Sequence, residues 1–178
     1  MSNNAAQWQP RATLVVTLIA LAALSRLLPH PPNFTPVEAM GLFAGSYLAD
    51  RRLALLVPLA AMALADLFLG LHGGMPVIYA LIAFNVWLGI RVGPSPSAGR
   101  VAGYGLVAAT VFFVVSNFAV WAMGAGHYYT QDLAGLVLCY TLALPFFAYT
   151  LAGMAVYTLA LYGGMALLTR GRGGLATA

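Results

Sequence analysis

The chain of 178 residues contains few side chains that could act as acids, bases, nucleophiles or metal ligands. It has 3 histidines, 4 acidic residues and 1 cysteine. Imidazole is the commonest metal ligand in proteins, so His30, His72 and His127 are candidates for a metal site, but none has a ligand at a spacing such as His-x3-His. The alternative is that they contact a bound solute or cap loops. These residues alone do not decide whether the protein binds a metal ion.

Catalytic motifs are absent from the sequence. There is no His-Glu-x-x-His, no Gly-x-Ser-x-Gly, no phosphate-binding loop and no pair of intramembrane aspartates. We therefore expect a protein that is not an enzyme and has no catalytic residues. A membrane enzyme that uses His72 or His127 with Asp66 as an acid–base set is the less favoured alternative.

Asp66 lies four residues inside the end of the apolar stretch 53–70, and Arg26 lies at similar depth in the stretch 12–28. An ionisable residue inside a bilayer is costly and is a functional hypothesis by default. We predict an Arg26–Asp66 ion pair, which either holds the helices together or forms part of a binding site.

Two other acids have local explanations. Thr35-Pro36-Val37-Glu38 reads as a capping box with proline at the first helical position, which makes Glu38 the capping carboxylate, with ligand contact as the alternative. Asp132 falls in the first turn of a helix that we expect to start near Thr130, where the helix dipole favours an anion.

The composition excludes a water-soluble globule, because 62% of the residues are hydrophobic and 7% are charged, against about 25% charged in an average soluble domain. One cysteine excludes a disulfide scaffold. Eight scattered arginines form no basic stripe, so no nucleic-acid partner is expected. The class of protein that these exclusions leave is an integral membrane protein of the lipid bilayer.

The apolar stretches predict an all-α polytopic protein with six transmembrane helices. Four stretches are long enough to cross a bilayer by themselves: 12–28, 53–70, 76–92 and 101–123. The stretch 133–169 contains Pro145 and is too long for one span, so we divide it into a short segment, 131–144, and a span, 145–169. The run 37–49 is short, and we interpret it as a short or tilted second span.

Arginine placement supports this count. With the N-terminus inside, seven of the eight arginines fall on the cytoplasmic side and only Arg26 falls near the outer side; the seven are Arg11, Arg51, Arg52, Arg91, Arg100, Arg170 and Arg172. The positive-inside rule then predicts an N-in, C-in membrane protein. The parts are a tail, 1–11, one transmembrane domain, 12–169, and a tail, 170–178. A cleaved signal peptide at 1–25 is the alternative for the first helix.

The outer loops, at about 29–36, 71–75 and 124–132, hold all three histidines together with many glycines and prolines. We expect them to form a polar, aromatic-rimmed pocket above an apolar bundle. The candidate substrate-binding residues are His30, Asn33, Asp66, His72, Asn117, His127 and Tyr128, with Tyr128 and Tyr129 stacking on a planar solute. For Asn117 an interhelical hydrogen bond is equally consistent.

Four motifs resemble those of a family of small bacterial membrane proteins that are described as transport proteins of unknown function. They lie at 29–37, 66–76, 116–121 and 139–147, and read Pro-His-Pro-Pro-Asn-Phe-Thr-Pro-Val, Asp-Leu-x-x-Gly-x-His-x-x-Met-Pro, Ser-Asn-Phe-Ala-Val-Trp and Cys-Tyr-x-x-Ala-x-Pro-Phe-Phe. More widely, the chain is similar to the substrate-binding S components of energy-coupling-factor (ECF) vitamin transporters, six-helix proteins of similar length.

The resemblance implies a vitamin-like or cofactor-precursor-like solute enclosed by the loops after helices 1, 3 and 5. It also implies an ECF-type energising module, an ATPase with a coupling membrane subunit, that recognises Ala-x-x-x-Ala in helix 1. Residues 12–23 contain no Ala-x-x-x-Ala, which leaves that partner open. In the cobalamin-binding type a cysteine ligates cobalt, and Cys139 is the candidate here; otherwise it is a packing residue or a reactive thiol.

The sequence thus predicts a membrane protein that binds a small solute at its outer face for uptake, as a transporter or as the substrate-binding component of one. A membrane scaffold without a small ligand is the main alternative. It would use Gly41, Gly45 and Ala49, a ladder of small residues at four-residue spacing, against a partner helix.

Overall fold

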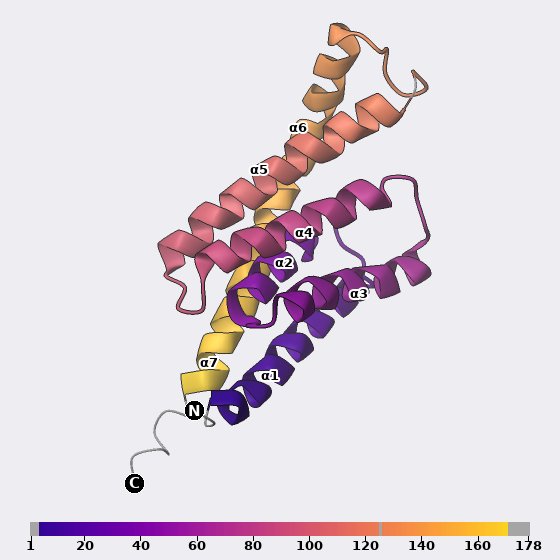
Figure 1. The fold of residues 1–178 in the computed structure, drawn as a ribbon. Coiled ribbons are helices and arrows are strands. Elements are labelled where there is room, and N and C mark those ends of the chain that lie inside the picture. Colours follow the sequence, from indigo (N-terminus) through magenta and orange to yellow (C-terminus); the bar gives the residue numbers. More distant parts are fainter. Residues whose placement is uncertain (1–3, 125, 171–178) are drawn as a thin grey trace.

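The computed structural model describes residues 4–124 and 126–170, and these residues are all-helical, with no strand among them. Six helical rods follow one another along the chain (Figure 1). They are α1 (Asn4–Ser25), α2 (Val37–Tyr47), α3 (Arg51–Leu69), α4 (Met75–Val92), α5 (Ala98–Met123) and a last rod made of α6 (Leu133–Thr158), the π-helix η1 (Leu159–Gly163) and α7 (Gly164–Arg170).

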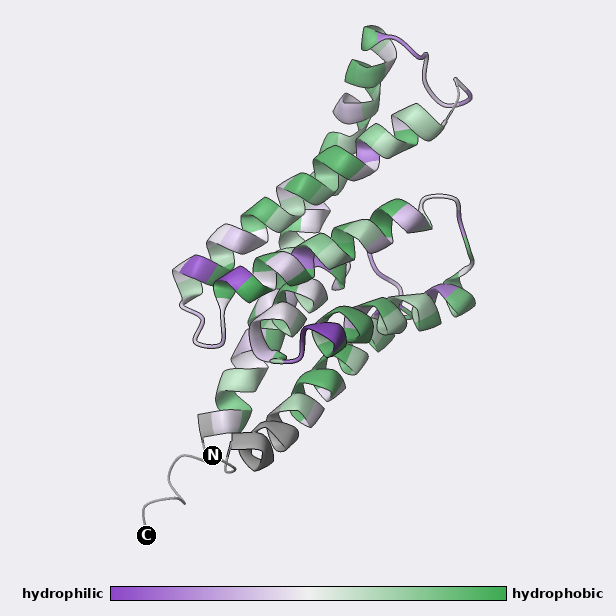
Figure 2. Ribbon diagram, viewed as in Figure 1, coloured by the Kyte–Doolittle hydropathy of each residue, from purple (hydrophilic) through white to green (hydrophobic). Residues whose placement is uncertain are grey.

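Four of these rods are long and apolar enough to cross a membrane: α3, α4, α5 and the run Leu133–Thr169. Ala12–Ser25 of α1 is a shorter apolar helix. Large apolar residues are exposed on the helices, for example Phe68 at 79% and Leu159 at 74% exposed. Figure 2 shows hydrophobic residues along most of the length of the helices. An apolar outer surface of this kind is suited to lipid, so the prediction of a helical membrane protein is confirmed.

The short helix α2 is a core element of the bundle. Val37–Ser46 is buried throughout, and the helix contacts α1, α3, α4, α5, α6 and η1. Its 11 residues make a length of about 16 Å, roughly half of the hydrocarbon thickness. The expected short or tilted helix over 37–49 is present as α2, and its neighbours are other helices and not lipid.

Close packing of α2 against α4 depends on three glycines. A Cβ at Gly45 would collide with the carbonyl oxygen of Val86, and a Cβ at Gly89 would collide with the carbonyl oxygen of Leu42. A Cβ at Gly41 would lie 2.8 Å from the Cβ of Asn85. Gly41 and Gly45 thus pack inside the molecule, which argues against their use on an external partner helix.

The division of 133–169 at Pro145 is wrong, because α6 continues through Pro145 without a break. Proline removes one backbone donor, but a helix surrounded by other helices tolerates this loss in a membrane. The irregularity of this rod lies instead at η1, one turn of π-helix that carries Tyr162.

The two ends of the bundle differ in their polar residues. Arg51 and Arg52 begin α3, Arg91 lies in the last turn of α4, and Arg100 lies in the first turn of α5. The start of α3, the end of α4 and the start of α5 lie toward the same side of the bundle as the start of α1 and the end of α7 (Figure 1), and we call this side the arginine end. The loops that carry the three histidines connect the helices at the opposite end, the histidine end. Arg172 lies outside the described residues.

Candidate functional site

A cleft of about 410 Å³ opens at the histidine end between the first turns of α4 and the last turns of α5. Its walls are mainly apolar, and its polar groups come from the two flanking loops and from Ser116 on α5. The lining residues are His72, Gly73, Gly74, Val77, Ile78, Ser116, Ala119, Val120, Met123, Gly124 and Tyr128. An apolar concavity with a few placed polar groups is the usual form of a small-molecule site.

Two of the predicted site residues, His72 and Tyr128, line this histidine-end cleft from different loops. His72 is exposed, and its backbone N–H points to the sulfur of Met75, 3.4 Å away, in the turn that begins α4. The Tyr128 ring is 77% exposed and contacts the position of Gly124, where a Cβ would lie 3.2 Å from Cδ2 of the ring. Both side chains are therefore free to contact a solute.

Hydrogen bonds fix the loop that carries Tyr128 to the end of α5. The indole Nε1 of Trp121 donates to the carbonyl oxygen of Thr130 at 2.9 Å, and the Gln131 amide donates back to the carbonyl oxygen of Trp121 at 2.7 Å. Asp132 is the N-cap of α6 and accepts from Gly135 N–H and the Thr130 hydroxyl, both at 2.7 Å. The Gly135 bond first, and then the Thr130 bond, lower the pKa of the Asp132 carboxyl. Asp132 thus has a local role at this helix start, as expected.

The other predicted loop residues lie away from the cleft lining. His30 and Asn33 are exposed in the loop between α1 and α2, and Asn33 has a left-handed backbone with φ of 62°. This loop packs on α6, where the Phe34 ring lies 5.8 Å from the Tyr157 ring. His127 is also exposed, and its backbone N–H closes a turn on Gly124.

Asn117 and Cys139 face one another across the α5–α6 interface and not the cleft. The Asn117 side-chain amide donates to the carbonyl oxygen of Phe113 at 2.7 Å, within its own helix. The buried Cys139 thiol donates to the carbonyl oxygen of Asn117 at 3.5 Å. Neither residue lines a cavity described here.

Arg26 and Asp66 form the expected ion pair, with Nη1 of Arg26 at 3.2 Å from Oδ1 of Asp66. The Tyr79 hydroxyl donates to the other carboxylate oxygen at 3.0 Å, and Nη1 of Arg26 also lies 2.7 Å from the sulfur of Met62. Asp66 is 2% exposed. The pair therefore joins the end of α1 to α3 and α4 inside the bundle, outside the cleft lining.

The capping box at Thr35-Pro36-Val37-Glu38 does not form. Pro36 occupies the N-cap position of α2 and no side chain caps the helix. Glu38 is instead buried, at 1% exposed, and its Oε1 has no hydrogen-bond partner. Because α2 starts inside the bundle, Glu38 is enclosed by other helices and does not reach back to Thr35.

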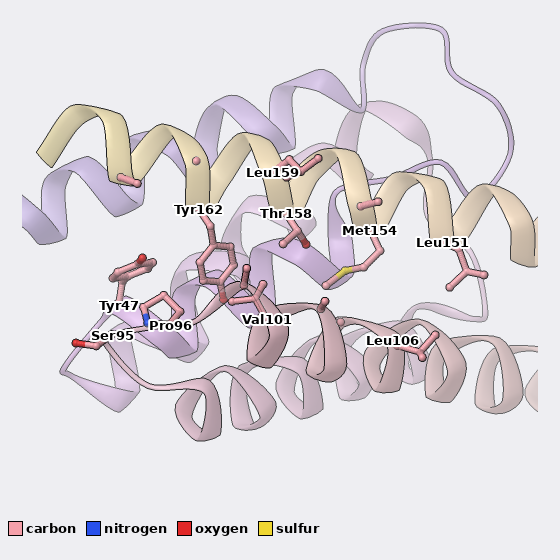
Figure 3. Close-up of a pocket in the computed structure, with 16 residues that line it drawn as sticks. Tyr47, Ser95, Pro96, Val101, Leu106, Leu151, Met154, Thr158, Leu159 and Tyr162 are labelled. Atoms are coloured by element: carbon pink, nitrogen blue, oxygen red, sulfur yellow. The ribbon is translucent and has the colours of Figure 1, made fainter. Parts of the chain in front are cut away.

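Sequence reasoning missed a second, larger cavity of about 840 Å³ at the arginine end. It lies between α5 and the α6–η1 rod, as Figure 3 shows, with Tyr47, Ser95 and Pro96 at its mouth. Tyr162 of η1 lines it and shares a hydrogen bond of 2.7 Å with the hydroxyl of Ser46. The small residues Ala98, Ala102 and Gly105 on one face of α5 were the signal that could have predicted it.

Metal ligands do not gather in the described part of the chain. Over residues 4–124 and 126–170, no group of three or more His, Cys, Asp or Glu is placed to hold an ion. The three histidines remain on separate loops, and only His72 lines the cleft.

The fold and these cavities define a helical membrane protein with a buried central helix and a cavity toward each end of the bundle. Residues 6–173 match the model of a family described as a family of unknown function (DUF6580), and the chain belongs to that family. Comparison with curated proteins and with solved structures gives no match.

Proposed function

We propose that this protein binds a small solute in the histidine-end cleft and serves its uptake, as a transporter or as the substrate-binding component of one. In this proposal the histidine end faces outward from the bacterial inner membrane, because the arginine end is the cytoplasmic side under the positive-inside rule. The observation that carries the proposal is the cleft itself, in which His72 and Tyr128 meet above apolar walls.

The chemistry of the cleft favours a solute that is partly planar and partly polar. The exposed Tyr128 ring offers a stacking surface, and His72 and Ser116 offer hydrogen bonds. A volume of about 410 Å³ falls in the range of small-molecule sites. A vitamin or cofactor precursor, as the ECF S-component resemblance implies, has this size and character.

The arrangement of the two cavities supports transport over simple binding. α5 lines the histidine-end cleft with Ser116–Gly124 and the arginine-end cavity with Val101–Leu106. The packed seam between α2 and α4 lies at the centre of the bundle. A solute that passes inward would leave one cavity and approach the other along α5.

Native mass spectrometry of the detergent-purified protein tests this proposal by looking for a retained solute. Where none is retained, a panel of water-soluble vitamins and their precursors is screened by thermal stabilisation, which reaches about 2.7 kcal/mol at a concentration 100 times Kd. A compound found in either way becomes the probe for the variants.

Two variants have matched controls in the chain. His72→Ala and Tyr128→Ala alter the cleft, while His30→Ala and Tyr149→Ala remove the same side chains elsewhere on the exposed surface. We expect binding to fall about fivefold or more in the first two, since one lost hydrogen bond or stacking contact is worth about 1 kcal/mol or more. If all four variants bound the compound equally well, the cleft would not be the binding site.

The energising partner is tested separately. Co-purification of an ATPase module with the wild-type protein from its native membrane would support an ECF-type component. Uptake by the purified protein alone in proteoliposomes would support an independent transporter.

A further inference from the structure

Two buried polar side chains have no use in the site described above. Glu38 on α2 and Asn85 on α4 are each 1% exposed. Oε1 of Glu38 has no hydrogen-bond partner, and neither Oδ1 nor Nδ2 of Asn85 has one. A buried polar group that is left unpaired costs about 1–3 kcal/mol, so three such atoms in one region need an explanation.

The packing of α2 on α4 brings these two residues to the same seam. Gly41 follows Glu38 by one helical turn, and a Cβ at position 41 would lie 2.8 Å from the Cβ of Asn85. Side chains on a helix lean toward its N-terminus, so Glu38 and Asn85 both belong to the part of the seam at and before Gly41. The absent side chain at Gly41 is what allows Asn85 to approach the backbone of α2.

Burial decides the charge state of Glu38, whose Oε1 has no hydrogen-bond partner. An ionised carboxylate taken out of water without compensation costs far more than the neutral acid, so the neutral acid is the stable form. The neutral acid has an O–H donor and a carbonyl acceptor, and the Asn85 amide has an acceptor and two donors. A proton on Glu38 therefore supplies the donor that Oδ1 of Asn85 lacks.

The charged and titratable groups around Glu38 do not replace that proton. Arg26 is the charged residue whose field acts on Glu38, but its Nη1 is paired with Asp66 of α3, which also holds the Tyr79 hydroxyl of α4, and its buried Nε has no hydrogen-bond partner. The elements packed against α2 also carry phenols, among them Tyr104 on α5, Tyr157 on α6 and Tyr162 on η1, and α6 carries the Cys139 thiol. The arginines of α3, α4 and α5 belong to the arginine end of the bundle.

We propose that Glu38 and Asn85 form a proton-binding site in the centre of the bundle. The Glu38 carboxylate takes a proton from a hydronium ion and leaves water, so one proton is bound and one negative charge is neutralised. Asn85 holds the resulting acid by hydrogen bonding. The site is a proton site and not a metal site, because one carboxylate and one amide supply too few oxygen ligands for a cation.

The position of the site between the two cavities would allow proton binding to be coupled to movement of α2 relative to α4. Asn85 lies two turns along α4 from Ile78 of the histidine-end cleft, and Glu38 lies on the same helix as Tyr47 of the arginine-end cavity. Proton binding and release at the seam therefore accompany any opening of α2 from α4. This coupling of solute uptake to protons rests on the proposed function, whereas the proton site itself does not.

Infrared spectroscopy of the full chain in lipid nanodiscs tests the site without any solute, so its outcome is independent of the cleft proposal. At neutral pH we expect the C=O stretching band of a protonated carboxyl group in the wild type. Glu38→Gln should remove the band, while Asp66→Asn and Asp132→Asn should keep it, because those two carboxylates are held ionised by Arg26 and by an N-cap. Asn85→Leu should keep the band and shift it to the frequency of a carboxyl group with weaker hydrogen bonding.

Three outcomes would overturn the proposal. They are the absence of the band in the wild type, its survival in Glu38→Gln, and its loss on adding sodium chloride but not N-methylglucamine chloride, which would assign the site to a cation. A band that does not move in Asn85→Leu would overturn the part assigned to Asn85.

Thermal unfolding gives a second readout on the same proteins. A native state that holds a proton the unfolded state releases loses stability as pH rises, so the melting temperature of the wild type should fall as pH rises above about 4.3, the ordinary pKa of a glutamic acid. Glu38→Gln mimics the neutral acid and should melt at a temperature that changes less with pH. Parallel pH dependence in both proteins would contradict the proton site.

Discussion

The seam between α2 and α4 gives the sharpest prediction, because glycine backbones and not flexible side chains set its spacing. In Gly45→Ala, the new methyl group would collide with the carbonyl oxygen of Val86 and lie 2.9 Å from the amide nitrogen of Ile90. It would also lie 3.0 Å from the carbonyl carbon of Gly89. All three are backbone atoms of α4, so the strain is relieved only when the two helices separate.

The magnitude follows from two opposing terms. Forcing a methyl group into a packed interface costs about 1–3 kcal/mol. Replacing glycine by alanine inside a helix returns up to about 1 kcal/mol through helix propensity. The net expectation for Gly45→Ala is therefore a loss within about 0–3 kcal/mol, in the upper part of that range because the methyl group meets backbone atoms. Gly89→Ala, which meets Leu42 and Gly45 from the other side, should behave alike.

The assay is reversible unfolding of the purified protein in mixed micelles, followed by circular dichroism. Gly103→Ala is the matched control, because Gly103 also lies inside a helix but has nothing within 4 Å of its Cβ position. We expect this control to be neutral or stabilised by up to about 1 kcal/mol. The double variant Gly45→Ala, Gly89→Ala should lose less than the sum of the single losses, since both methyl groups relieve their strain by the same separation of helices.

The reasoning would be refuted if Gly45→Ala were as stable as Gly103→Ala. That result would mean that α2 and α4 do not approach as closely as the structure shows. The central position of α2, and the seam that holds Glu38 and Asn85, would then be in question as well.

Two further predictions concern charged groups. Asp66→Arg should lose about 3–5 kcal/mol by leaving a buried charge unpaired, while the swap Arg26→Asp, Asp66→Arg should recover part of that loss in the same unfolding assay; equal losses would argue against direct pairing. At the N-cap of α6, hydrogen bonds to Gly135 and Thr130 lower the pKa of Asp132, so its stabilisation is present at neutral pH and is lost as pH falls through the lowered value. The protection factors of the backbone amides in the first turn of α6, which correct for the intrinsic pH dependence of exchange, should therefore fall in acid in the wild type and be low already at neutral pH in Asp132→Ala. Unchanged exchange in that variant would contradict the cap.

Hydropathy was sufficient to predict the class of protein. The apolar stretches around 53–70, 76–92 and 101–123 correspond to α3, α4 and α5 within a few residues. Apolar runs of this length are determined by the lipid solvent, which acts on each segment separately. Arginine position likewise identified one end of the bundle before any helix was placed.

Length alone was an incomplete guide at two places. Pro145 indicated a break in 133–169, but the surrounding helices tolerate the missing donor and α6 continues. The run 37–49 was interpreted as a short or tilted span, and α2 is a short helix enclosed by its neighbours. Hydropathy cannot distinguish a helix surrounded by lipid from one surrounded by protein, because both environments are apolar.

The candidate site, like the fold, was predicted only in part from the sequence. The sequence by itself determined which polar residues are rare and at which end of the bundle the histidines lie, because composition and charge act through the solvent. Only the tertiary structure decided that His72 and Tyr128 share a cleft, that Asp66 is paired within the bundle, and that Glu38 is enclosed without a partner. Those outcomes depend on which faces of the helices contact one another. In this protein the close approach of α2 to α4 at Gly41, Gly45 and Gly89 joins residues far apart in the sequence and determines which faces those are.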